Sequence, residues 1–179
     1  MINMKRFLGL LVCAFIFNSC DDGDITLENF NFDTAAAVND CTVNNDLYFK
    51  IKNNEALILQ TPATSFENTV TPVDTPRTLV INSTNQVIYR LFSGPVTSTY
   101  FCSDIPEATP TVSDEWIASN GIEGVSGIIE ITTTQILNPD TQAITGYNHY
   151  IVFRNITFSN ADNSFVYEEY VFGNYVTTP

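Results

Sequence analysis

The sequence predicts an all-β protein built from antiparallel strands, and three observations lead to that prediction. Short runs rich in Val, Ile, Thr, Phe and Tyr recur along the chain. Clusters of Asn, Pro, Gly and Ser separate these runs, as turns separate strands. No stretch has the 3.6-residue apolar period that is typical of an amphipathic helix.

The first half of the chain is expected to hold five strands. The clearest alternation is in residues 47–52, where three apolar side chains alternate with a tyrosine and two lysines, as expected for a half-buried strand. Asn53 and Asn54 tolerate positive φ and suit a tight turn, which predicts a β-hairpin with residues 55–60. Residues 61–76 contain three prolines and no apolar period, and should form a long loop. The other expected elements are strands at 25–32, 78–82 and 86–92, the last two paired as a second hairpin, and a loop or short edge piece at 34–45.

The second half reads as a meander of longer strands. The last two strands carry apolar residues on both parities, with a slip of phase near Arg154 and again at Glu168 and Glu169. Such a slip predicts a β-bulge or a strand covered on both faces. The expected elements are a Gly-Pro turn region at 93–99, a short strand at 100–103, and strands at 128–137, 144–158 and 165–176. Residues 113–118 are expected to form an edge strand, with a capped helical turn as the alternative. About ten strands with turns between them favour an antiparallel β-sandwich, immunoglobulin-like or related, with a closed β-barrel as the alternative.

The N-terminus has the features of an export signal. Lys5 and Arg6 precede an unbroken apolar run at residues 7–17, and no acidic residue lies in this region. Eleven helical residues at about 1.5 Å each cover roughly half of a ~30 Å hydrocarbon core, so a spanning helix is not expected. Cys13 lies inside the run and is interpreted as a small apolar residue.

The apolar run ends in the sequence Phe-Asn-Ser-Cys at residues 17–20. This sequence resembles the lipobox of bacterial lipoproteins, although Phe17 stands where leucine is usual. The resemblance implies that Cys20 is acylated and becomes the N-terminus of a protein held in the outer membrane by its lipid. Two or three acyl chains anchor stably, since each buried CH₂ contributes roughly 0.8 kcal/mol. The alternative is an ordinary cleaved signal with a chance cysteine.

The acidic run at 21–24 resembles the tract that follows the lipidated cysteine in some surface lipoproteins. Display on the cell surface is therefore a further expectation. An ordinary solvated linker is the alternative interpretation of the same residues. Together these features divide the chain into a signal peptide at 1–19, an acylated tether at 20–24 and a single all-β domain at 25–179.

Composition excludes one class of partner. After residue 19 the chain has five basic and twenty acidic residues, a formal charge of −15. A surface of that charge repels nucleic acid and anionic lipid head groups, so no nucleic-acid partner is expected.

Cys41 and Cys102 remain as an even pair in an exported protein. An oxidising envelope predicts a disulfide between them, with two buried free thiols as the alternative. Closing a loop of this length contributes about 4 kcal/mol on the chain-entropy model. Two distant cysteines and one histidine do not make a structural zinc set, so no metal ligand and no cofactor is assigned.

No catalytic residue is assigned from the sequence. His149 is the sole histidine and lies in an expected strand, where a structural role is the ordinary interpretation. Residues 124–127, Gly-Val-Ser-Gly, lack the spacing of a Gly-x-Ser-x-Gly nucleophile elbow. Paired carboxylates would have to come together through the fold, and the candidates are Glu168, Glu169, Glu130, Glu115 and Asp114.

The function hypothesis is a non-enzymatic, lipid-anchored module that binds a glycan or a protein partner. Its alternatives are a small envelope carbohydrate hydrolase that uses paired carboxylates, and a structural accessory subunit of an envelope complex. A binding surface would use exposed aromatic rings, and strand packing is the other use for such rings. The candidate rings are Tyr89, Tyr100, Trp116, Tyr147, Tyr150, Tyr167 and Tyr170.

Overall fold

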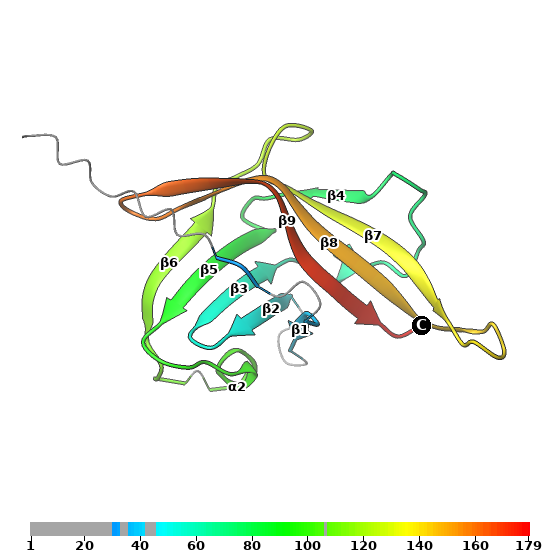
Figure 1. Ribbon diagram of the computed structural model, residues 1–179, viewed down its shortest axis with the longest axis horizontal. Helices are drawn as coiled ribbons and strands as arrows, with labels where there is room; N and C mark the ends of the chain where they lie inside the picture. The colour runs from blue at the N-terminus through cyan, green and yellow to red at the C-terminus, as the bar shows by residue number, and fades with distance from the viewer. Residues whose placement is uncertain (1–29, 33–35, 42–45, 106) are drawn as a thin grey trace, which may run out of the picture.

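A computed structural model describes residues 30–32, 36–41, 46–105 and 107–179 (Figure 1). The expected signal peptide, Cys20 and the acidic tether lie outside the described residues. So does most of the strand expected at 25–32, and its described part, residues 30–32, is not in a strand.

The described residues form nine strands, one five-residue helix and one short 3-10 turn, so the all-β prediction is confirmed. No described helix has the length and apolar sequence needed to cross a bilayer. The strands are β1 (Asn39–Asp40), β2 (Leu47–Lys52), β3 (Glu55–Gln60), β4 (Arg77–Val80), β5 (Gln86–Phe92), β6 (Val112–Ala118), β7 (Ile128–Leu137), β8 (Ile144–Ser159) and β9 (Ser164–Thr177), and the helix is α2 (Ser98–Cys102).

All nine strands belong to one hydrogen-bonded sheet, in which β8 pairs with three other strands, β6, β7 and β9. The order is β1-β2-β3-β5-β6-β8-β7-β4, and β9 pairs along the other edge of β8. The early part of β8 pairs with β7, while its last two residues, Phe158 and Ser159, pair with β6. One half of the sheet, made of β1, β2, β3, β5 and β6, therefore continues through β8 into the other half, made of β7 and β4 (Figure 1). The choice between a sandwich and a barrel stays a prediction.

The switch of β8 from one neighbour to the other occurs at Asn155. This residue has φ of 47°, and its carbonyl accepts from the Gly127 amide (2.9 Å) just beyond the last β7 pair. The register of β8 against β9 also shifts between Ile151 and Val152, opposite Gly173 at φ of 130°. The phase slip expected near Arg154 is therefore confirmed, and it marks the place where the sheet changes partners.

The local predictions for adjacent strands hold. The β2–β3 hairpin turns at Asn53 with φ of 56°, and residues 61–76 form the long loop, with a 3-10 turn at Ala63–Ser65. Strand β6 and the β7–β8–β9 meander lie within two residues of the expected bounds. Alternation and turn chemistry act over a few residues, which is why the sequence predicts these elements well.

The predicted hairpin of residues 78–82 with 86–92 is wrong. Strand β4 pairs with β7, and β5 lies between β3 and β6, so the chain crosses between the two halves of the sheet here. The Asn82 side chain accepts from the Thr84 and Asn85 amides and makes the expected reversal. A turn signal predicts that the chain changes direction. It does not predict which strand pairs with each strand edge, because that depends on residues far away in the sequence.

The short strand predicted at 100–103 is also wrong, because residues 100–102 belong to α2 and Ser103 is its C-cap. The helical turn brings Tyr100, Phe101 and Cys102 together against a small core cluster around Phe49 and Phe92. A strand would have sent alternate side chains to opposite faces. Partial burial of both rings against the same cluster therefore favours the helix.

Two apolar clusters cover the two faces of β2 and β3. The main cluster takes side chains from both halves of the sheet, including Leu57 of β3, Ile131 of β7 and Phe153 of β8. The smaller cluster lies under α2. As a result Tyr48, Phe49 and Lys50 are all buried, and the prediction that this strand is half-buried is wrong.

Candidate functional site

A hollow of about 490 Å³ lies where β8 changes partners, and we call it the Arg154 hollow. It is bounded by Thr78, Val80, Ile128, Glu130, Arg154 and the loop at 123–125. The residues that line it come from β4, β7 and β8 and from the loop between β6 and β7. This loop projects from the sheet (Figure 1). The site therefore combines one charged cluster with apolar walls.

Arg154 is the centre of the charged cluster. Its Nε donates to Oε2 of Glu130 at 2.8 Å, and its Nη1 donates to Oε2 of Glu169. The hydrogen bond that Arg154 donates to Glu130 is the main cause that raises the pKa of Arg154. The three side chains come from β7, β8 and β9. Arg154 is directly opposite Glu169 on β9 and Ile128 on β7, and Glu130 follows Ile128 by two residues, so it is the diagonal neighbour of Arg154 on the same face. One guanidinium thus holds two carboxylates in fixed positions.

The wall of the hollow is a tight loop pinned at its base. Gly127 has φ of 61°, and a Cβ there would lie 2.6 Å from the Cα of Gly121, so the two ends of the loop cross at close range. The Gly121 amide donates to the Ile81 carbonyl, and the Ile81 amide donates to the Gly127 carbonyl, both at 2.8 Å. The Asn155 side chain donates to the Val125 carbonyl at 3.1 Å. The loop is therefore tied to Ile81, directly after β4, and to β8.

The rim of the hollow is apolar and exposed. Val125, which lines the hollow, is 61% exposed, and Ile122 in the same loop is 62% exposed, while Ile128 of the lining is buried. Glu123, which lies between these two residues in the sequence, also lines the hollow. Exposed aliphatic groups beside fixed charges are common in binding surfaces.

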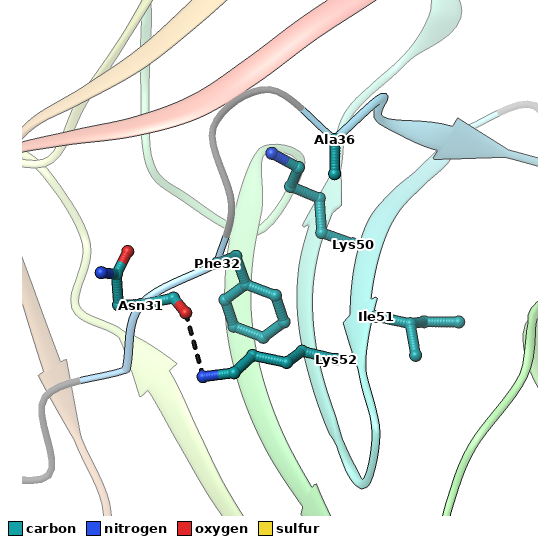
Figure 2. Close-up of a pocket in the computed structure, with 6 residues that line it drawn as sticks. All are labelled: Asn31, Phe32, Ala36, Lys50, Ile51 and Lys52. Carbon is teal, nitrogen blue, oxygen red and sulfur yellow. Dashed lines mark hydrogen bonds between the residues drawn. The ribbon is translucent and has the colours of Figure 1, made fainter.

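A second hollow, of about 440 Å³, lies between β2 and the segment before β1 (Figure 2). Lys50 and Lys52 extend from the same face of β2, with the Phe32 ring between their stems. The Lys52 ammonium donates to the Asn31 carbonyl at 3.2 Å, and Lys50 is only 3% exposed. The aliphatic stems pack on the ring while the charged ends reach polar groups. The residues around this hollow therefore hold the segment at 30–32 against β2.

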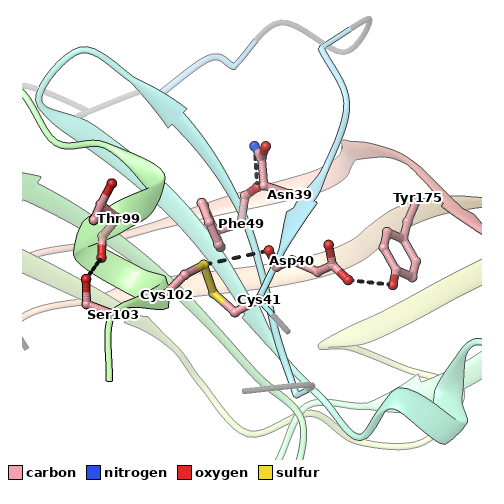
Figure 3. Close-up of a disulfide and its surroundings, with 8 residues drawn as sticks. All are labelled: Asn39, Asp40, Cys41, Phe49, Thr99, Cys102, Ser103 and Tyr175. Carbon is pink, nitrogen blue, oxygen red and sulfur yellow. Dashed lines mark hydrogen bonds between the residues drawn. A yellow bond between two sulfur atoms is a disulfide. The ribbon is translucent and has the colours of Figure 1, made fainter. Parts of the chain in front are cut away.

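The disulfide between Cys41 and Cys102 is present, as predicted, with 5.2 Å between the Cα atoms. It links the end of β1 to α2 across the small cluster, and the Phe49 ring lies beside it (Figure 3). The next residue back, Asp40, accepts from the Tyr175 hydroxyl at 3.0 Å. A shallow hollow here is lined by backbone and small polar groups, and its parts serve to fasten β1 and α2 to the sheet.

His149 is fully buried and is held by two threonines. Its Nδ1 lies 2.9 Å from Oγ1 of Thr133, and its Nε2 lies 3.0 Å from Oγ1 of Thr177. The rings of Phe66 and Tyr175 pack against the imidazole. Burial, with the nearby charge of Arg77 as the smaller cause, lowers the pKa of His149 to about 4.

The donor and acceptor in each hydrogen bond of His149 follow from the other hydrogen bonds that Thr177 and Thr133 make. Thr177 donates to Oδ1 of Asn68 (2.5 Å), so its oxygen must accept from Nε2–H of His149. Nδ1 is then the acceptor of the Thr133 hydroxyl, whose oxygen accepts from Arg77 (3.4 Å). A neutral imidazole completes this chain of donors, and a second proton on the ring would break it.

The cluster fixes His149 in a structural role, as the ordinary interpretation of a strand histidine expects. Both ring nitrogens are used by threonines, and the side chain has no exposed surface. A general base must reach the proton that it removes from a substrate.

The fold brings some of the candidate carboxylates together and keeps others apart. Glu130 and Glu169 meet at Arg154, whereas Glu168 is exposed beside them. Glu115 pairs with Arg90 at 2.5 Å, and Asp114 accepts from Nε1 of Trp116 at 2.9 Å. Among the described residues no group of three or more His, Cys, Asp or Glu side chains could hold a metal ion.

Most of the candidate aromatic rings serve packing. Tyr89, Trp116 and Tyr170 are buried, and Tyr150 is the one ring of the seven in the exposed class, at 39%.

Sequence reasoning missed the Arg154 hollow, although the sequence contains a signal for it. An arginine followed by asparagine interrupts the longest apolar run of the second half, at the phase slip.

Comparison with known proteins finds no matching family model, no matching characterised protein and no matching solved structure, so function is argued from the site itself.

Proposed function

We propose that this chain is a lipid-anchored, non-enzymatic binding module of the bacterial outer envelope, held by acylated Cys20. The leader and the lipobox-like sequence at 17–20 support export and anchoring. The disulfide supports the same compartment, since such bonds form and persist in oxidising surroundings.

The observation that carries binding, as opposed to catalysis, is the state of the carboxylates in the Arg154 hollow. Glu130 is tied to the Arg154 guanidinium, which also holds Glu169. A glycosidase needs one carboxyl group that donates a proton and one that stays ionised, free to face the substrate. Here a cation stands between the two acids, an arrangement suited to orienting a bound group.

The hydrolase remains the second candidate because Glu123 and Glu130 line the same hollow. One experiment separates the two functions. The purified exported protein is incubated with immobilised envelope oligosaccharides and with immobilised peptides, and both retention and cleavage are measured. Saturable retention without cleavage supports the binding module. Release of shortened oligosaccharide that is abolished by Glu130→Gln would overturn it in favour of hydrolysis.

Location is tested on intact cells. Protease added outside the cells should cut the protein while a periplasmic control protein survives, if the acidic run at 21–24 directs surface display. The purified protein must be cut by the same protease for the comparison to count. Protection in cells despite cleavage of the purified protein would place the module inside the envelope.

A further inference from the structure

The Arg154 hollow has the composition of a peptide site, and this inference rests on the proposed binding function. None of its lining residues is aromatic. Sugar recognition usually uses a ring that stacks on the sugar face, and the hollow offers aliphatic walls instead. A peptide can use such walls for the aliphatic part of a side chain.

The charge of the hollow selects the kind of side chain. Glu123, Glu130 and Arg154 line the hollow and carry a formal charge of −1, and Glu169, which pairs with the same guanidinium from outside the lining, brings the formal charge of the group to −2. No ion pair reaches Glu123 from the described residues, while Glu130 and Glu169 share Arg154. A cation entering the hollow would complete the charge balance.

The rest of the molecule adds to this preference. The chain has seven basic against twenty acidic residues, and its field attracts cationic partners from a distance. The three described arginines are all paired with glutamates. The exposed Val125 side chain, which lines the hollow, would cover the methylene stem of an incoming side chain and exclude water around its charged end.

We propose that the Arg154 hollow is the docking site for a basic segment of a partner protein, which places a lysine or arginine side chain between Glu123 and Glu130. The aliphatic stem lies against Val80, Val125 and Ile128, and the charged end faces the carboxylates. The loop at 121–127 is tied at both ends, so the site exists before the partner arrives. Preformed sites lose less ordering entropy on binding.

The test uses a short synthetic peptide in which two arginines stand among valine and threonine. Matched peptides carry glutamine or glutamate in place of arginine. Binding to the full exported protein is measured by fluorescence anisotropy at low and at physiological salt. The arginine peptide should bind at least tenfold more tightly than the glutamine peptide, and salt should weaken it.

Two matched pairs of variants separate the hollow from the general acidic field. Glu123→Gln should weaken the peptide about two- to fivefold, while Glu107→Gln, which removes the same charge from an exposed loop elsewhere, should leave it within the error. Val125→Lys places a cation at the rim and should weaken binding tenfold or more. Val73→Lys adds the same charge at a valine that is 87% exposed and should have little effect.

Each outcome decides the inference. Equal effects of the two members of either pair would attribute binding to overall charge and overturn the proposed site. Binding of oligosaccharide without binding of the arginine peptide would overturn the basic partner and leave the proposed binding function standing. Cleavage of oligosaccharide would overturn the proposed function instead.

Discussion

The buried histidine makes stability depend on pH in a window that can be stated in advance. An unfolded chain binds a proton at His149 with a pKa near 6.5, while in the folded protein the pKa is about 4. Between these values the unfolded state binds more protons, so the free energy of unfolding falls as the pH falls. The interval corresponds to about 3 kcal/mol, present in full above pH 6.5 and lost by about pH 4.

The charged and titratable groups around the His149 ring are consistent with its lowered pKa. Arg77 approaches from β4 and opposes a second positive charge, and its partner Glu67 lies 3.8 Å from the guanidinium. Tyr175 stacks on the imidazole from β9, and burial raises the pKa of its own hydroxyl to about 12, so it stays neutral throughout the window. No described carboxylate bonds the ring directly.

The direct measurement is the titration of the imidazole carbon-bound protons by NMR. Because the chain has one histidine, the signal needs no assignment. We expect a midpoint at about pH 4, and a midpoint near 6.5 would refute the reasoning. Urea unfolding at pH 7.5, 5.5 and 4.5 measures the free energy of unfolding. The His149→Gln variant, which has no imidazole to titrate, is the control. The wild-type protein should lose more stability than the variant as the pH falls, whereas parallel losses would show that other groups are responsible.

Three further predictions concern the anchor, the disulfide and the switch in β8. Cys20→Ala should release the exported domain into the soluble fraction, and continued recovery of the variant in membranes would contradict lipid anchoring. Replacing Cys41 and Cys102 by serine should lower the free energy of unfolding by about 4 kcal/mol on the chain-entropy model, measured by urea unfolding against the oxidised wild type; an unchanged midpoint would sink this estimate. Asn155→Gly should be tolerated better than Asn155→Ala by about 1 kcal/mol, since both lose the bond to Val125 but only glycine accepts φ of 47° without strain. Equal stabilities of the two Asn155 variants would mean that the backbone relaxes there.

The Arg154 cluster shows how far sequence reasoning reached toward the site. The phase slip was visible, because apolar parity changes around Arg154 and around Glu168 and Glu169. Which acid would meet which partner was not visible, since Glu130 and Glu169 are 24 and 15 residues away from Arg154 in the chain. Their meeting depends on the registers of two ladders, and a shift by one residue would send each carboxylate to the other face.

The sequence by itself determined the local chemistry of this protein: strands from alternation, turns from Asn, Gly and Pro, and an oxidisable cysteine pair. Each of these depends on residues a few positions apart or on composition. The tertiary structure alone decided that β4 joins β7, that the residues around Cys102 coil into α2, and that His149 is enclosed with no exposed surface. Those outcomes depend on which apolar faces are covered and which strand edges are occupied, and only the packed chain supplies that information.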